Sequence, residues 1–340
     1  MAILVSGGAG YIGSHTSVEL LRAGYDIVIA DNFSNSKPVV LDKIRSLGGR
    51  DFAFRECDLR CGKQTAALFD DYPIDAVIHF AALKAVGESV EIPLAYYDNN
   101  LRSTLNLLSE MERHGICDFV FSSSATVYGA AETVPLREDA PLSTASPYGS
   151  TKLMIETILT DVQRARPEMN VAILRYFNPI GSDSSGELGE DPNGIPNNLV
   201  PYIARVAIGR LDHLSVFGDD YDTPDGTCIR DYIHVTDLAL GHIAALRRLK
   251  EKPGLVVYNL GTGRGSSVLD VVRAYSRAVG RDIPYVIAPR RAGDVPRCYA
   301  DPAKAERELG WRALRGLDEM CRDSWNFQKK YPNGYESEEK

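Results

Sequence analysis

The sequence predicts an α/β protein built on a doubly wound parallel sheet, with a smaller α/β lobe after it. Short β-branched apolar runs alternate with helical stretches over the first half of the chain, as in βα units on a sheet that is buried on both faces. A glycine-rich turn follows the first of these runs, and a carboxylate ends the second. With 340 residues, the chain is long enough for about two domains.

The first half of the chain supplies the strands and helices of the sheet in regular alternation. The expected strands are residues 2–6, 27–31, 52–55, 76–80, 117–122 and 170–176. The expected helices are residues 12–23, 38–47, 63–71, 93–114 and 147–166. Several of these helices begin or end at Pro, Gly or Ser, which are common at helix termini. This order predicts parallel strands whose connecting helices cover both faces of one sheet.

The composition of the chain changes after Asn178, and we expect a boundary there between two domains, residues 1–177 and 178–340. Residues 181–197 are rich in Gly, Pro, Asp and Asn, which is typical of a long functional loop. Further on we expect helices at 198–209, 235–250, 266–280 and 315–328 and short strands at 214–217, 256–260 and 284–287. These elements predict the smaller lobe.

Composition and charge exclude several classes of protein. Hydrophobic residues make up 44% of the chain and charged residues 25%, as in an ordinary globular protein. The net charge of −8 disfavours nucleic acid or an anionic membrane as the main partner. The six cysteines form no CxxC pair, and neither a basic leader nor a run of 18 apolar residues occurs. We therefore expect a cytoplasmic protein with reduced thiols, no membrane segment and no metal.

The glycine-rich turn predicts a dinucleotide site. In the segment GGAGYIG, residues Gly7, Gly10 and Gly13 stand where the backbone must approach a pyrophosphate at a helix N-terminus. Asp31 ends the second strand, 18 residues after Gly13, where a carboxylate can accept from both hydroxyls of an adenosine ribose. It would repel a 2′-phosphate, and the next two residues offer no arginine to bind one. The pattern therefore predicts a Rossmann-type site for NAD rather than NADP.

The ends of the later strands supply the rest of the predicted groove. Ligands of such sheets bind outside the carboxyl ends of the strands, where Asp58 and the segment 80–84 stand. Taken alone, Asp58 is equally well explained as an ordinary loop residue. Tyr148 and Lys152 lie at i and i+4 on a helix that follows the serine-rich end of the fifth strand, so both project from one helical face. We expect this pair to move protons during a hydride transfer, although the same spacing also suits a simple aromatic–aliphatic contact.

Together these motifs resemble the extended short-chain dehydrogenase/reductase family over nearly the whole chain, and within it the UDP-glucose 4-epimerases. The resemblance rests on GGAGYIG, Asp31, SSSATVYG at 122–129, the Tyr148–Lys152 pair, RYFNP at 175–179 and RDYIHV at 230–235. It implies that Tyr148, as a phenolate, takes the proton of the sugar 4-hydroxyl while NAD receives the hydride. Ser124 would share the hydrogen bond to that oxygen. The transient 4-keto sugar would then turn its other face to the cofactor, so that NAD need not leave.

The resemblance extends to the full set of site residues. Those expected around NAD are Gly7, Gly10, Tyr11, Ile12, Gly13, Asp31, Asn32, Phe33, Asn35, Ser36, Asp58, Leu59, Phe80, Ala81, Ala82, Lys84, Asn99, Ser122, Tyr148, Lys152 and Tyr176. Those expected around the UDP-sugar are Ser124, Tyr148, Phe177, Asn178, Asn198, Leu199, Val216, Phe217, Arg230, Arg291, Asp294 and Cys298. Arg230 and Arg291 would clamp the pyrophosphate, because a guanidinium fork matches paired oxygens.

A phenolate at neutral pH needs an electrostatic cause. A free tyrosine titrates near 10, so the pKa of Tyr148 must fall by about 3 units. Two positive charges at about 5 Å, the Lys152 ammonium and the oxidised nicotinamide, would each supply about 3 kcal/mol at an effective dielectric constant of about 20. We expect this sum to exceed the cost of desolvation.

Single positions bear on the substrate range and on competing functions. Cys298 stands where some epimerases carry a tyrosine, so we expect room for UDP-N-acetylhexosamines, unless the thiol merely fills core space. A nucleotide-sugar 4,6-dehydratase would need an Asp-Glu pair where Ala125 and Thr126 stand. A net NAD-dependent dehydrogenase or a non-enzymatic NAD sensor would also use the cofactor motifs.

The helices at 93–114 and 147–166 resemble those that form a dimer contact in this family, so we expect a homodimer.

Overall fold

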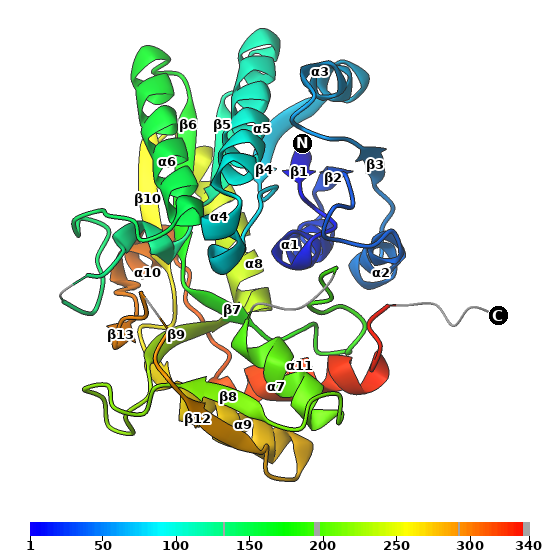
Figure 1. The fold of residues 1–340 in the computed structure, drawn as a ribbon. Coiled ribbons are helices and arrows are strands. Elements are labelled where there is room, and N and C mark those ends of the chain that lie inside the picture. Colours follow the sequence, from blue (N-terminus) through cyan, green and yellow to red (C-terminus); the bar gives the residue numbers. More distant parts are fainter. Residues whose placement is uncertain (132, 194–197, 292, 336–340) are drawn as a thin grey trace.

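A seven-stranded parallel sheet with helices on both faces forms the larger part of the computed structural model (Figure 1), which describes residues 1–131, 133–193, 198–291 and 293–335. The strand order is β10-β6-β5-β4-β1-β2-β3, and all neighbouring strands run parallel. The order reverses direction at β1, as in a doubly wound sheet. The predicted fold class is therefore confirmed.

The elements of this part lie close to their expected positions. The strands are β1 (Ala2–Ser6), β2 (Asp26–Asp31), β3 (Ala53–Glu56), β4 (Ile74–His79), β5 (Asp118–Ser122), β6 (Asn170–Tyr176) and β10 (Leu255–Leu260). The helices are α1 (Tyr11–Arg22), α2 (Val39–Gly48), α3 (Gly62–Asp71), α4 (Val86–Glu91), α5 (Pro93–His114), η1 (Ala125–Tyr128), α6 (Pro147–Ala165) and α8 (Val235–Leu249).

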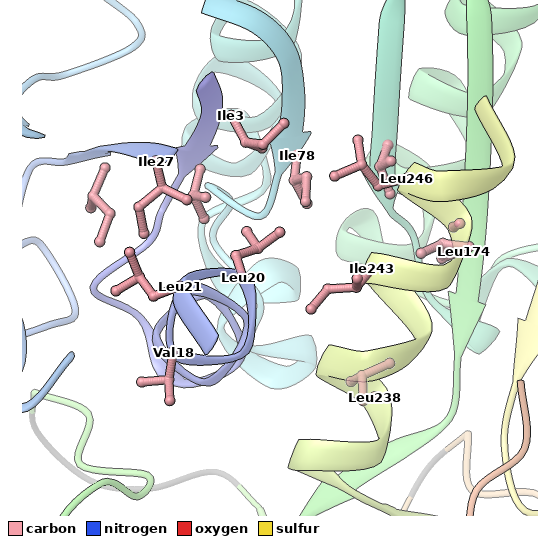
Figure 2. Packing of buried hydrophobic residues seen from close by; sticks show 14 of the residues in the cluster. Ile3, Val18, Leu20, Leu21, Ile27, Ile78, Leu174, Leu238, Ile243 and Leu246 are labelled. Carbon is pink, nitrogen blue, oxygen red and sulfur yellow. The ribbon is translucent and has the colours of Figure 1, made fainter. Parts of the chain in front are cut away.

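Alternate residues of each strand point to opposite faces of the sheet and pack in two separate cores. In β1, Ile3 and Val5 pack with α1, α2 and α8 on one face of the sheet, where Leu20 and Ile243 meet the strands (Figure 2). Leu4 packs on the opposite face with α3, α5 and α6. Because both faces are covered, the strands are apolar along nearly their whole length, as the sequence indicates. The carboxyl ends of all these strands meet at one edge, which is where the site is built.

The smaller lobe surrounds a third core below the large sheet in Figure 1. Its strands are β7 (Asn178–Ile180), β8 (Leu214–Phe217), β9 (Ile229–His234), β11 (Gly265–Ser267), β12 (Tyr285–Ala288) and β13 (Arg297–Cys298). Its helices are α7 (Leu199–Ala207), α9 (Val268–Val279) and α11 (Leu317–Lys330), while α10 (Ala303–Leu309) lies against β10. Strands β7, β11 and β13 all pair with β9, and β12 pairs with β8.

Two elements expected in the smaller lobe belong to the large sheet. The strand expected at 256–260 is β10, which pairs with β6 at the sheet edge, and the helix expected at 235–250 is α8, which packs against α1 (Figure 2). A single boundary at residue 178 is therefore wrong for these two elements. The reason is that a buried apolar strand has the same sequence pattern in either sheet. The pattern therefore does not predict which sheet the strand joins.

Several short elements were not expected at all, namely α4, η1, β7, β9, β11, β13 and α10. The last four residues of the expected loop 181–197 lie outside the described part of the chain. Within that described part, no helix is long and apolar enough to span a membrane, and no group of acidic, His or Cys side chains is arranged to hold a metal. All six cysteines are free.

Candidate active site

The turn between β1 and α1 is an anion cradle. Gly7 has a φ of +71°, and a Cβ there would lie 2.7 Å from the backbone nitrogen of Ala81. A Cβ on Gly13 would lie 2.2 Å from the Gly7 carbonyl oxygen, so both glycines are required by backbone packing. Gly10 differs, since a Cβ there would meet only that carbonyl oxygen, at 3.3 Å. No side chain caps α1, so its first N–H groups face the space beside Gly10 and suit a phosphate.

The carboxylate of Asp31 connects this turn to the next loop. It accepts hydrogen bonds from the Ala9 N–H (3.0 Å), the Phe33 N–H (2.9 Å) and the Ser36 hydroxyl (2.9 Å). A carboxylate offers about four acceptor positions, so capacity is left for a ribose hydroxyl. Asp31 is nearly buried, so its carboxylate has little freedom to rotate and its remaining acceptor position has a fixed direction.

The expected contacts after β3 are engaged within the chain. Asp58 accepts from the Arg60 guanidinium at 2.6 to 3.1 Å, and this hydrogen bond lowers the pKa of the carboxyl. The Leu59 side chain is buried in the core, so only its backbone is left for a ligand. The predicted role of both residues near NAD stays a prediction.

The loop that begins at Gly181 crosses from the cradle to the adenosine end of the predicted groove. Its Gly181 carbonyl accepts from the Tyr11 hydroxyl at 2.7 Å, and Glu190 accepts from Lys84 at 2.9 Å. Asp191 accepts from Lys37 at 2.7 Å. Two further contacts reach the loop after β2: the Asn193 N–H donates to the Asn35 side chain at 3.2 Å, and its amide donates to the Ser34 carbonyl at 3.2 Å. The segment therefore joins three parts of the chain that carry predicted cofactor residues: the start of α1, the loop after β2 and the loop after β4.

Glu190 was not singled out from the sequence. It accepts from Lys84 and also from the Asn198 amide at 3.1 Å. Burial alone would lower the pKa of Lys84, but the charge of Glu190 and its hydrogen bond raise it. The only sequence signal was its place in a long polar loop. Asn99, which is expected near NAD, donates to the Asn100 side chain at 3.0 Å.

The structure brings Tyr148, Lys152 and Ser124 together at the ends of β5 and β6. Ser146 caps α6 and Pro147 occupies its first turn, which places Tyr148 and Lys152 on the face toward β5. The Lys152 ammonium donates to the Ser122 carbonyl at 2.8 Å and lies 5.9 Å from the centre of the Tyr148 ring. The side chains of Ser124 and Tyr176 both act on the Tyr148 hydroxyl: Ser124 lowers its pKa and Tyr176 raises it.

Burial dominates the electrostatics of this group. Burial raises the pKa of Tyr148 well above its ordinary value, and Tyr176 adds to the effect. Burial also lowers the pKa of Lys152 to about 7, so its positive charge is only partly present at neutral pH. The chain by itself therefore keeps Tyr148 protonated. The expected phenolate depends on the second cation, a bound nicotinamide ring, more than the sequence argument assumed.

A buried ion pair behind the serines was not expected. Glu156 on α6 accepts from the Ser123 hydroxyl at 2.6 Å and from two nitrogens of Arg175, at 2.7 and 3.1 Å. Arg175 also donates to the Tyr128 hydroxyl at 3.1 Å, and Tyr128 donates to Asn259 on β10 at 2.7 Å. This network joins β5, η1, α6, β6 and β10. An arginine in the apolar run 170–176 was the one signal that could have revealed it.

A second charged cluster lies on the smaller lobe. Asp294 lies 3.0 Å from the Arg291 guanidinium and 3.5 Å from that of Arg230, and Arg291 lies 5.2 Å above the Phe217 ring. Four residues that the sequence assigned to the UDP end are thus in contact. Val216 is different, because its side chain faces the core of the lobe and is 1% exposed. The expected role of Val216 in the segment beside the base stays a prediction, and only its backbone is left to line the site.

The residues expected along the sugar path are spread between the two clusters. Cys298 pairs in register with Arg230 and packs in a small apolar cluster with Phe177 and Val127, so it lies between the charged cluster and η1. Burial raises the pKa of its thiol. Asn178 and Asn198 are exposed, and Leu199 is half-buried against the third core.

Comparisons with known proteins agree with this geometry. The model of the NAD dependent epimerase/dehydratase family matches residues 3–261. A UDP-glucose 4-epimerase of Bacillus subtilis (strain 168) is 58% identical over 339 residues, covering 100% of both chains. The crystal structure of a UDP-glucose 4-epimerase from Bifidobacterium longum in complex with NAD+ and UDP has 53% identity and a TM-score of 0.95, covering 98% of this chain and 100% of that one.

A third relative gives the same result. A UDP-glucose 4-epimerase from Brucella ovis, solved in complex with NAD, has 43% identity and a TM-score of 0.90, covering 96% of this chain and 98% of that one. The chain belongs to the NAD dependent epimerase/dehydratase family.

Proposed function

We propose that this protein is a UDP-hexose 4-epimerase that interconverts UDP-glucose and UDP-galactose with a tightly held NAD. One observation carries the proposal: the Tyr148–Ser124–Lys152 group lies at the sheet edge between an anion cradle and a separate arginine cluster. The names of the relatives at 54% and 58% identity support the same reaction. Six free thiols agree with a reducing compartment such as the cytoplasm.

The residues present fit NAD. The free N–H groups of the first turn of α1 would hold its pyrophosphate and Asp31 an adenosine ribose hydroxyl, while Lys152 would donate to the nicotinamide ribose. Bound NAD supplies a reversible two-electron acceptor, and its positive ring favours ionisation of the neighbouring phenol. Everything else in the reaction is done by side chains of this chain.

Tyr148 is the acid–base group of the proposal. Its phenolate takes the proton of the sugar 4-hydroxyl, and the hydroxyl of Ser124 donates to the same sugar oxygen. When the 4-keto group is reduced from the opposite face, Tyr148 returns the proton. The sequence contains no carboxylate at Ala125 or Thr126, where dehydration would need an acid and a base. Net redox is zero, so the cofactor is regenerated in each cycle.

The cluster on the smaller lobe anchors the nucleotide. Arg230 and Arg291 hold the pyrophosphate, Asp294 accepts from the uridine ribose, and Phe217 lies beside the base, with its side chain 40% exposed. Because the grip is on UDP and not on the hexose, the keto sugar is free to rotate. Asn178 and Asn198 would line the path between the two clusters.

The test is an assay on the purified protein without added NAD. We expect conversion of UDP-galactose to UDP-glucose, and release of about one NAD per chain on denaturation. Accumulating NADH would instead identify a net dehydrogenase, and a 4-keto-6-deoxy product a dehydratase. Bound NAD without any turnover would identify a sensor. Each of these three results would overturn the proposal.

Cys298 supports a wider substrate range. Its small side chain lies beside Phe177, between the arginine cluster and η1, and leaves more room than a tyrosine would. We propose that UDP-N-acetylglucosamine and UDP-N-acetylgalactosamine are also interconverted. Comparing the two substrate pairs in one preparation tests this: no turnover of the acetylated pair would refute it.

We also propose that the protein forms a homodimer through α5 and α6, which lie side by side on one flank of the sheet (Figure 1). Large apolar side chains are exposed on this flank, at Leu94 (81%), Leu105 (50%) and Met154 (44%). Such a patch suits a self-complementary interface. Light scattering should give twice the chain mass of 37.3 kDa, and a mass of one chain would contradict the proposal.

A further inference from the structure

Glu190, in the loop after β7, is a carboxylate that the mechanism above does not use. Its side chain is largely buried, with 11% exposed. One of its oxygens, Oε1, accepts from the Lys84 ammonium at 2.9 Å and also from the Asn198 amide at 3.1 Å. Lys84 is expected near NAD, and Asn198 is expected near the UDP-sugar. A single carboxylate oxygen therefore joins one residue from each half of the expected site.

Lys84 lies beside the anion cradle. The segment before it includes Ala81, whose backbone nitrogen is 2.7 Å from the position of a Cβ on Gly7. The Lys84 ammonium is 6.0 Å from the centre of the Tyr11 ring, and Tyr11 is the first residue of α1. A cation at this place suits a pyrophosphate at the helix N-terminus. Because the Lys84 side chain is 44% exposed, the bond to Glu190 is what restricts its ammonium to this side.

The charge of Glu190 acts on two groups beside the cradle. Burial lowers the pKa of Lys84, but the charge and the hydrogen bond of Glu190 more than offset this, so the pKa is raised. Burial raises the pKa of Tyr11, and the charge of Glu190 adds to that effect. The Tyr11 hydroxyl therefore keeps its proton, which it donates to the Gly181 carbonyl at 2.7 Å. Glu190 thus favours a charged lysine and a neutral phenol beside the cradle.

Asn198 is the N-cap residue of α7, but its side chain does not cap this helix. Its amide nitrogen donates to Glu190 instead. An exposed asparagine side chain can adopt several rotamers, and a hydrogen bond to a largely buried acceptor reduces this freedom. Glu190 therefore orients the amide of Asn198 as well as the ammonium of Lys84.

We propose that Glu190 is a positioning residue that holds Lys84 for the cofactor and Asn198 for the nucleotide sugar. The proposal rests on the epimerase function proposed above. The two contacts differ in kind, because the bond from Lys84 joins two charged groups and the bond from Asn198 comes from a neutral donor. Loss of the whole side chain should release both partners. A glutamine keeps an oxygen that can accept two hydrogen bonds, so it should mainly weaken the hold on Lys84.

The test uses purified enzyme with bound NAD and measures two quantities without turnover. These are the rate at which bound NAD exchanges for radiolabelled NAD and the Kd of UDP by calorimetry. In Glu190→Ala we expect NAD exchange about tenfold faster and a Kd about fivefold higher, as for the loss of one charged and one neutral hydrogen bond. In Glu190→Gln we expect NAD exchange about threefold faster and a Kd within about twofold of wild type.

Double variants show whether Glu190 acts through its two partners. Combining Glu190→Ala with Lys84→Met should give no faster NAD exchange than Lys84→Met alone. Combining it with Asn198→Ala should give no higher Kd for UDP than Asn198→Ala alone. Additive effects in either pair would show that Glu190 acts by another route, and this would overturn the proposal.

Glu187 offers a matched control in the same loop. Its carboxylate also binds a lysine, Lys43 at 2.7 Å, and its side chain is 30% exposed. Its other partners are Lys330 and Tyr331, on and just after α11. Glu187→Ala should therefore leave both quantities unchanged. Equal effects of Glu187→Ala and Glu190→Ala would indicate a general loosening of the loop and overturn the proposal.

The remaining results also decide between the proposals. Unchanged or slower NAD exchange in Glu190→Ala, an unchanged Kd, or the same Kd in Glu190→Ala and Glu190→Gln would overturn the role of Glu190. If the expected changes occur in a protein that does not epimerise, the proposed function fails and the role of Glu190 stands. If the protein epimerises and the changes are absent, the reverse holds.

Discussion

Removing the Glu156 carboxylate should destabilise the protein more than any exposed charge change. Glu156 and Arg175 have side chains that are each 5% exposed, and Nη2 of Arg175 lies 2.7 Å from the carboxylate. In Glu156→Ala the guanidinium stays buried and charged, with only the Tyr128 hydroxyl and the Glu138 carbonyl as acceptors. Breaking a buried pair in this way costs about 3–5 kcal/mol. That is a large share of a total stability of about 5–15 kcal/mol.

The measurement is the midpoint and slope of denaturant unfolding, followed by tryptophan fluorescence. Asp161→Ala is a control on the same helix, because its partner Arg164 is at 3.5 Å and both side chains are more than two-thirds exposed. Its midpoint should barely move. Replacing both partners, as Glu156→Leu with Arg175→Met, should recover most of the loss. A loss below about 1 kcal/mol for Glu156→Ala would refute the reasoning that the network is held by this pair.

Three further predictions concern selectivity, pH and cofactor retention. Cys298→Tyr should abolish turnover of UDP-N-acetylhexosamines and retain that of UDP-glucose; an equal fall in both would contradict the gate. Hydrogen bonds from Lys330 and Lys43 lower the pKa of Glu187 from 4.5 to about 2, so its stabilisation is complete above pH 4.5 and is lost as the pH falls toward 2. Unfolding curves of Glu187→Gln should therefore differ from wild type by a constant amount above pH 5 and converge with it below pH 4, and parallel curves would contradict this. Asp191→Asn loosens the loop that crosses the adenosine end, so the purified protein should carry less NAD per chain after gel filtration; full occupancy would show that the loop does not retain it.

The parts of the site that were predictable are those set by short-range geometry. The cradle follows from glycine spacing within seven residues, and the Tyr148–Lys152 face follows from the helical repeat. The alternation of β8 would also have shown that Val216 and Phe217 face opposite ways, so only one of them can present its side chain to a ligand.

What could not be predicted depends on how distant segments assemble. His242 contacts Ser122 across 120 residues, and it does so only because α8 returns to the large sheet. Glu190 and Lys84 are 106 residues apart. The cost of burying Tyr148 and Lys152 could not be predicted for a related reason: the attraction of a lysine can be estimated from spacing, but the cost of burial requires the packed structure.

The most direct test of the role of Tyr148 is the Tyr148→Phe variant in protein that has retained its NAD. We expect an unchanged cofactor content and unchanged UDP binding, with kcat lower by about 10²–10⁴-fold, since only the proton-transfer group is lost. Turnover within about threefold of wild type, at full NAD occupancy, would contradict the claim that this phenol carries the proton.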